Sequence, residues 1–180
     1  MRQWISGLLL LLSLSACTPH FNPILTTSQE HILYTQLKKT VKGIDTEEAR
    51  RLSKEAIQYS KKLATQYKVS TPPLVHNFLV NIGMKERGLC YQWSDDLYTH
   101  LQSFHFRSIQ FKPVGANVGK YWSEHNALVV LPRDDDAMRY GVLLDPWRNS
   151  GKLYSAPILK DPEYRWRIRT DRCDIYQKGR

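Results

Sequence analysis

The sequence predicts an α+β fold in which N-terminal helices pack on an antiparallel sheet. Three observations predict it. Apolar residues recur at intervals of three and four in the first half of the chain, as in amphipathic helices. Beyond residue 104 they alternate with polar residues or form short runs, as in strands. The predicted helices therefore precede the predicted strands along the 180-residue chain, which favours an α+β architecture.

The first 16 residues, MRQWISGLLLLLSLSA, have the layout of a secretory signal peptide: an early arginine, a short apolar run and small residues. Residues 14–17, Leu-Ser-Ala-Cys, resemble a bacterial lipobox. This resemblance implies cleavage before Cys17, lipidation of Cys17 and a membrane anchor. By the same resemblance, Thr18 in place of Asp favours a cell-envelope location at the outer membrane, facing the periplasm. The alternatives are an ordinary cleaved signal or an uncleaved anchor helix.

Residues 17–27 contain two prolines and no period, so we interpret them as a tether to a single domain at residues 28–180. Four helices are expected in that domain. Asp45 is predicted to cap the second helix, because its carboxylate can accept from free N–H groups at the helix start. Gly83 is a plausible end of the third helix. The expected helices cover residues 29–41, 45–67, 72–83 and 90–104.

Strands are expected after the helices. Ile109 and Phe111 alternate with polar residues, and Pro113 and Gly115 are expected to end that strand. Two apolar runs, residues 125–131 and 140–145, flank a polar turn and suggest an antiparallel hairpin. One further strand is expected near residues 164–168.

The net charge of the chain excludes few classes of partner. Lys and Arg number 26 and Asp and Glu number 17, so the net charge is 26 − 17 = +9. A basic exported protein can meet anionic lipid or an anionic wall polymer. We do not expect nucleic acid as a partner, because a lipid-anchored exported protein meets little of it. The basic residues are dispersed, so an ordinary solvated surface is an equally good interpretation.

Cys90, His125 and Asp145 are the candidate catalytic residues. Cys90 opens a predicted helix, His125 begins one strand of the hairpin and Asp145 ends the other. The positive end of a helix dipole and a nearby imidazolium both favour the nucleophilic thiolate. A carboxylate on the second ring nitrogen would fix the histidine tautomer and stabilise the cation. The hairpin would bring His125 and Asp145 together, and a helix packed on the sheet could present Cys90.

Three segments, RGLCYQWSDDL, EHNALVV and VLLDPW, carry these residues in the order Cys, His, Asp. They resemble the transglutaminase-like branch of the papain-like thiol enzymes. The resemblance implies that Cys90 is the nucleophile, His125 the general base and acid, and Asp145 the orienting group, without a cofactor. The sequence departs from the family pattern at Tyr91, where Trp or a small residue is more usual. A peptide or cell-wall peptide is the substrate expected from the location.

Several alternatives stay open. Cys90 and Cys173 could form a disulfide in an oxidising compartment, and the protein would then be a non-catalytic binding or assembly module. A zinc site of Cys90 with His100 and His105 lacks the usual ligand spacing, so no metal is expected. The N–H of Cys90 is one candidate oxyanion donor. The candidates for a second donor are Asn81, Gln92, Tyr121 and Trp122.

Overall fold

Helices come first and strands second along the computed structural model, which describes residues 23–120 and 123–170. The α-helices of this part are α1 (Pro23–Thr40), α2 (Thr46–Gln66), α3 (Pro73–Asn81) and α4 (Cys90–Gln102). The strands are β1 (Ile109–Ala116), β2 (His125–Pro132), β3 (Val142–Asp145), β4 (Tyr154–Pro157) and β5 (Arg167–Ile168). Short 3₁₀ helices, η1 (Met138–Tyr140) and η2 (Ile158–Lys160), flank β3 and β4 in sequence. The predicted α+β class is confirmed, with four helices against a five-stranded antiparallel sheet in the described residues.

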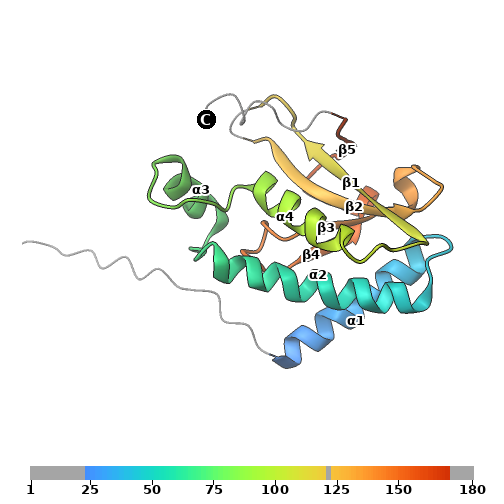
Figure 1. Cartoon of the computed structure of the whole chain (residues 1–180). Helices are drawn as coiled ribbons and strands as arrows, with labels where there is room; N and C mark the ends of the chain where they lie inside the picture. Colours follow the sequence, from blue (N-terminus) through green and yellow to red (C-terminus); the bar gives the residue numbers. More distant parts are fainter. Residues whose placement is uncertain (1–22, 121–122, 171–180) are drawn as a thin grey trace, which may run out of the picture.

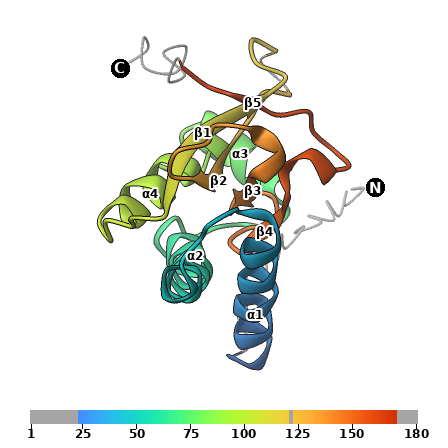
Figure 2. The ribbon, with the colours of Figure 1, turned by 90° about the vertical axis from the view of Figure 1, so that its right-hand side faces the viewer.

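The strands are ordered β4-β3-β2-β1-β5, and every neighbouring pair is antiparallel. β2 and β3 pair as the predicted hairpin, with Leu128 opposite Leu144. Figures 1 and 2 show the long helices α1 and α2 on one side of the sheet. All eight residues of β2 are buried, because both faces of this central strand are covered.

Each face of the sheet has its own core. On the helix side, Leu128, Val130 and Leu144 pack with buried residues of α1, α2 and α4. On the other side, Val129 and Leu143 pack with Ile158, Trp166 and other residues of the chain that follows β3. The C-terminal part of the described chain therefore covers the face that the helices leave open.

The start of α2 follows the sequence prediction. Asp45 Oδ1 accepts hydrogen bonds from the backbone N–H groups of Glu47 and Glu48, both at 2.9 Å. The hydrogen bond from Glu48 is the largest influence on this carboxylate, and the pKa of Asp45 lies below its usual value. Ala49, Leu52 and Leu63 are buried on the helix side that faces the core. The helix starts where an Asp can satisfy its free N–H groups.

Two expectations about boundaries are wrong. α1 begins at Pro23 rather than at residue 29, so residues 23–27, which were expected to have no regular structure, are helical. Proline is well tolerated in the first helical turn, where its missing N–H group has no intrahelical acceptor. β1 also runs through Pro113 to Ala116. The carbonyl of Pro113 accepts from the N–H of Arg169, so the proline nitrogen faces that side and not β2.

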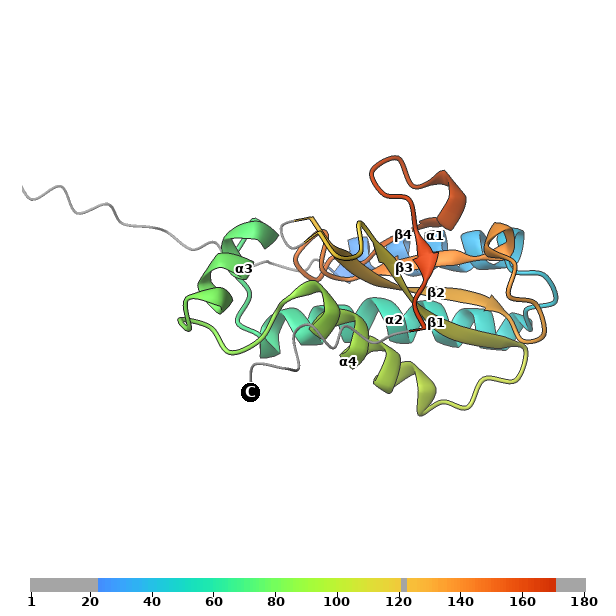
Figure 3. The ribbon, with the colours of Figure 1, turned by 90° about the horizontal axis from the view of Figure 1, so that it is seen from above.

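The C-terminal strands also differ from the prediction. β3 begins at Val142 because η1 occupies residues 138–140. β4 was not predicted, since Tyr-Ser-Ala-Pro has no clear alternation. β5 is limited to Arg167–Ile168 within the segment expected near residues 164–168. Among the described helices, none combines the length and the hydropathy needed to cross a membrane. Figure 3 shows α3 at one end of the folded part.

Candidate active site

Cys90 is the first residue of α4, and the turn before it is held at several points. Gln92 Oε1 accepts hydrogen bonds from the N–H groups of Gly88 and of the next residue, at 2.7 and 3.0 Å. Trp93 Nε1 donates to the carbonyl of Gly88 at 2.9 Å. Gly88 has a φ of +129°, and the ring of His76 lies where a Cβ would stand. The positive end of the α4 dipole therefore carries Cys90 on a well-supported turn.

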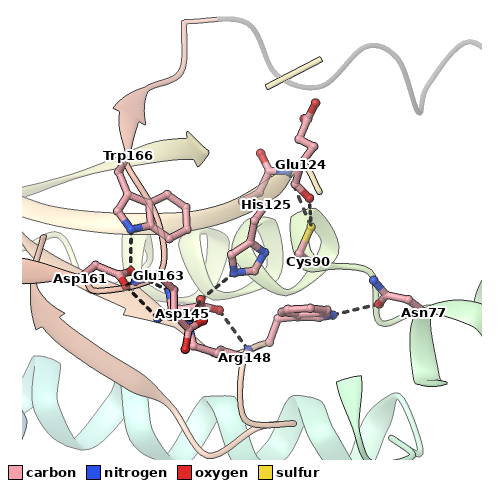
Figure 4. Close-up of polar contacts among 11 residues, drawn as sticks. Asn77, Cys90, Glu124, His125, Asp145, Arg148, Asp161, Glu163 and Trp166 are labelled. Atoms are coloured by element: carbon pink, nitrogen blue, oxygen red, sulfur yellow. Dashed lines mark hydrogen bonds and ion pairs between the residues drawn. The ribbon is translucent and has the colours of Figure 1, made fainter. Parts of the chain in front are cut away.

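His125 and Asp145 lie at adjacent strand ends, where β2 begins and β3 stops. His125 Nε2 and Asp145 Oδ2 are 2.7 Å apart, and the two residues are only 2% and 0% exposed (Figure 4). A carboxylate accepts hydrogen bonds, so Nε2 carries the proton of this contact. This confirms that the hairpin brings the two residues together, and it leaves Nδ1 as the second ring nitrogen.

Burial and the attraction between His125 and Asp145 have opposite effects on the pKa values of this pair, and the attraction is the stronger. Burial alone would lower the pKa of His125. The charge of Asp145, together with hydrogen bonds to Asp145 and Cys90, outweighs burial and raises this pKa to about 10. Burial would raise the pKa of Asp145, but the charges of His125 and Arg148 hold it below its usual value. The pair is therefore an imidazolium and a carboxylate at neutral pH.

Arg148 is a second partner of Asp145. Its Nε donates to Asp145 Oδ2 at 3.0 Å, and its backbone N–H donates to Oδ1 at 3.1 Å. The two outer nitrogens of the guanidinium bind both carboxylate oxygens of Asp161, at 3.1 and 2.7 Å. Trp166 Nε1 donates to the same carboxylate at 2.7 Å. Every oxygen of Asp145 is thus occupied by a donor, which fixes the carboxylate against His125.

Aromatic rings surround the imidazole. The ring centroids of Trp147, Tyr164 and Trp166 lie 4.7, 4.8 and 5.4 Å from that of His125. Trp147 Nε1 also donates to Asn77 Oδ1 at 2.9 Å, which connects α3 to the site. These rings exclude water from the His125–Asp145 pair and strengthen its electrostatic attraction.

The thiol of Cys90 lies beside His125 in Figure 4. Its Sγ is 3.9 Å from the carbonyl oxygen of Glu124 and 3.7 Å from Asn126 Nδ2. The orientation of the Asn126 amide is set by Arg169, which donates to Asn126 Oδ1 at 2.9 Å. A cation can only be paired with the amide oxygen, so the NH₂ group is directed to Cys90.

A second buried ion pair supports this amide. Arg169 and Glu124 are 2.5 Å apart, and their side chains are 3% and 2% exposed. The other carboxylate oxygen of Glu124 accepts from the N–H of Gly119 at 2.8 Å. Arg169 is thereby held between a carboxylate and the Asn126 amide on one edge of the site.

The other predicted oxyanion donors have different positions. Gln92 caps the start of α4 through its carbonyl oxygen. Asn81 is exposed at the end of α3. Tyr121 and Trp122 lie outside the described residues, as do Cys17 and Cys173, so the expected lipidation and the alternative disulfide fall there too. Cys90 has a free thiol within the described part of the chain.

No metal cluster is formed by the side chains in residues 23–120 and 123–170. His100 stacks on Tyr59 and contacts Glu55, nearly three turns along α4 from Cys90. His105 follows the far end of the same helix. These two histidines are therefore not gathered around Cys90.

Sequence reasoning missed Asn126, Arg148, Glu124 and Arg169. A polar Asn inside the apolar run HNALVVLP was a usable signal, since a buried amide in a central strand needs partners. The two arginines carried no comparable signal, because their carboxylate partners come from other segments of the chain.

Comparisons with protein-family models, curated proteins and solved structures find no match to this chain. The resemblance to papain-like and transglutaminase-like enzymes therefore rests on the three short segments, and the function is argued from the geometry of the site.

Proposed function

We propose that the protein is a membrane-anchored thiol hydrolase or acyltransferase that acts on amide bonds of a peptide or cell-wall peptide. Cys90 is the nucleophile, His125 the general base and acid, and Asp145 the orienting carboxylate. The observation that carries the proposal is the buried His125–Asp145 pair, 2.7 Å apart, with Cys90 next to it at a helix start. A histidine that is charged at neutral pH and lies beside a thiol is the environment that favours a thiolate.

The reaction follows from the two ring nitrogens. Asp145 occupies Nε2, so Nδ1 exchanges its proton with Cys90. The thiolate attacks the carbonyl carbon of the amide, and an S–C bond forms. The C–N bond then breaks as Nδ1–H protonates the departing amine, which leaves a thioester on Cys90. Water or an amine attacks the thioester, His125 takes its proton, and the thiolate of Cys90 is released.

The tetrahedral intermediate needs donors for its oxyanion. The backbone N–H of Cys90 has no hydrogen-bond partner in the described part of the chain, as expected at a helix start. Asn126 Nδ2 lies 3.7 Å from Sγ and is directed there by Arg169. We assign the backbone N–H of Cys90 and the side-chain amide of Asn126 as the oxyanion donors, since both lie close to Cys90 Sγ, which forms the new bond.

The proposal also includes a papain-like or transglutaminase-like fold and a lipid anchor in the outer membrane. A helix with the nucleophile at its start, packed on an antiparallel sheet with His and Asp at adjacent strand ends, supports a papain-like or transglutaminase-like assignment. The lipobox at residues 14–17 supports an acylated Cys17 and an outer-membrane anchor facing the periplasm. Peptides of the cell envelope are the substrates within reach of such an anchor.

One observation favours a different function. His125 is 2% exposed beneath three aromatic rings, which is more covered than a substrate-contacting group requires. A non-catalytic envelope lipoprotein that uses this fold for binding or assembly, with Cys90 inert or bonded to Cys173, fits that burial. The two functions differ in whether Cys90 forms a covalent intermediate.

The test is to trap that intermediate. The full chain is incubated with cell-wall stem peptides and with peptide amides, with and without an added primary amine. Released amine and transferred product are measured, and acylated Cys90 is sought by mass spectrometry after acid quenching. The proposal predicts product and a Cys90 adduct, both abolished by Cys90→Ala and His125→Gln. Turnover that survives Cys90→Ala, or a panel that yields neither product nor adduct, contradicts it.

A further inference from the structure

The short helix α3 turns its apolar side to solvent. Leu74, Phe78 and Ile82 lie four residues apart on one face and are 68%, 60% and 50% exposed. Val75 in the helix and Met84 shortly after it are also exposed, at 45% and 70%. Large apolar side chains gathered on an exposed surface mark a place where something else binds. We call these five residues the α3 apolar surface.

The opposite side of α3 is polar and is attached to the body. His76 is buried, accepts at Nδ1 from the N–H of Ser70 and donates from Nε2 to the carbonyl of Arg87. Asn77 accepts from Trp147 at 2.9 Å. The usual amphipathic arrangement is therefore reversed, because polar contacts hold the helix and the apolar residues point outward.

The shape of this region suits a flat partner. Figures 1 and 3 show α3 projecting from one end of the folded part, away from the sheet. Within the described residues α3 packs extensively against no other helix or strand. A projecting helix with a convex apolar face is fitted to enter an interface, whereas a peptide ligand is usually held in a groove.

The charge around α3 favours an anionic partner. The segments that flank α3 in the chain contain Lys68, Lys85 and Arg87 and one acidic residue, Glu86. Arg87 is paired with Asp96 at 2.8 Å, so Lys68 and Lys85 are the cations available beside the helix. Lys85 Nζ donates to the carbonyl of Lys68 at 2.9 Å, which places two lysines together beside the helix. Two copies of this surface would bring like charges together, so self-association is disfavoured. An anionic surface would be attracted.

We propose that α3 is an interfacial anchor that inserts its apolar surface into an anionic lipid layer, with Lys68 and Lys85 against the headgroups. Apolar burial and headgroup attraction add in such a contact. Since Asn77 joins α3 to Trp147 beside His125, insertion would also hold the candidate active site near the membrane surface. The proposal does not depend on thiol chemistry.

The test measures amide hydrogen exchange residue by residue, so that α3 is distinguished from any lipid contact of the N-terminal segment. The full chain carries Cys17→Ser to prevent acylation. It is mixed with phosphatidylcholine vesicles, with or without roughly one-third phosphatidylglycerol, at low and high salt. We expect exchange at residues 72–85 to slow with the anionic vesicles at low salt, and this protection to fall at high salt.

Two sets of variants decide the outcome. The triple variant Leu74→Ser, Phe78→Ser, Ile82→Ser should lose the protection, whereas Ile32→Ser with Leu159→Ser, which alters exposed apolar residues elsewhere, should keep it. Lys68→Gln with Lys85→Gln should weaken binding about fivefold for each charge removed. Unchanged exchange in β2 shows that each variant is folded.

The proposal is overturned if vesicles leave residues 72–85 unprotected. It is also overturned if neutral and anionic vesicles protect them equally, or if protection grows with protein concentration in the absence of lipid. The last result would assign the α3 apolar surface to a second copy of the chain.

Discussion

Asn126 shows how one charge can direct a buried amide. Arg169 occupies its oxygen at 2.9 Å, so the NH₂ group faces Cys90. The proposed oxyanion contact forms only when a carbonyl is attacked. Loss of this contact should therefore slow amide turnover but not simple alkylation of the same thiol.

Asn126→Ala should lower kcat for amide turnover by about 10²–10³-fold, the usual cost of losing an oxyanion donor. Alkylation of Cys90 by iodoacetamide has no oxyanion and should change little. Asn149→Ala, at an exposed position, is the control and should leave both rates unchanged. If turnover and alkylation fall together, Asn126 supports the site only as a packing group.

His125 gives a pH prediction whose sign follows from its raised pKa. Its pKa in the folded chain is about 10, against 6.5 for the ordinary side chain. Protonation therefore stabilises the fold. This contribution is fully present below about pH 6.5 and is lost as the pH rises through about 10.

Nitrogen NMR of the imidazole should show both ring nitrogens protonated at about pH 8, well above the ordinary pKa of histidine. Asp145→Asn should move the titration to lower pH, because the nearest negative charge is removed. Cys90→Ala should move it in the same direction. A His125 that titrates near its ordinary value in the native chain would show that the pair is not ionised as described.

At the scale of single elements, the turn before α4 is the most constrained part of the site. Gly88→Ala would place a Cβ 2.1 Å from His76 Nε2 at a φ of +129°. We expect a loss of about 2–4 kcal/mol in the free energy of unfolding, because strain and a clash act together. Alkylation of Cys90 should also change as the start of α4 shifts. Urea unfolding and labelling measure the two effects.

Gly83→Ala is the matched control. Its φ is +78°, but nothing lies within 4 Å of the added Cβ. Only the left-handed backbone is penalised, at about 1 kcal/mol. Equal effects at the two glycines would mean that the contact with His76 does not hold the turn.

Elements with strong local signals could be predicted from the sequence. The cap at Asp45, the helical spacing of α2 and α4, and the β2–β3 hairpin all depend on residues that are close in the chain. β4 and β5 could not be predicted in the same way, because they are stabilised by pairing with strands already formed. Pro113 was a misleading signal, since a strand tolerates proline where its nitrogen faces away from the main partner.

At the scale of the whole molecule, two buried arginines attach the C-terminal part of the described chain to the sheet. Arg148 joins Asp145 to Asp161, and Arg169 joins Glu124 to Asn126. The segment between these arginines covers the sheet face opposite the helices. The site is therefore completed only when this segment is in place.

Arg148→Met should destabilise the fold by about 3–5 kcal/mol, because Asp161 would lose its buried cation and Asp145 would keep only His125 as a positive partner. Arg50→Met is the control. It removes an exposed contact with Glu47 and should cost less than about 1 kcal/mol. Denaturant unfolding of both variants compares the costs. A small effect at Arg148 would mean that the buried network adds little to stability.

The sequence allowed Cys90, His125 and Asp145 to be selected because each lies at the end of a predictable element. The residues around them could not be selected, since Arg169 contacts Glu124 and Asn126 across more than 40 positions in the chain. Such contacts depend on the path of the C-terminal segment over the sheet, and no local pattern encodes that path.

The proposed pairing of the Cys90 thiolate with the His125 imidazolium is tested by the rate of Cys90 alkylation against pH in the full chain. Peptide mass spectrometry separates Cys90 from Cys17 and Cys173. We predict that Cys90 is readily alkylated at neutral pH and that His125→Gln strongly slows this reaction. A native Cys90 that reacts no faster than in the His125→Gln variant, or that labels only after reduction, would contradict the proposed pairing of Cys90 with His125.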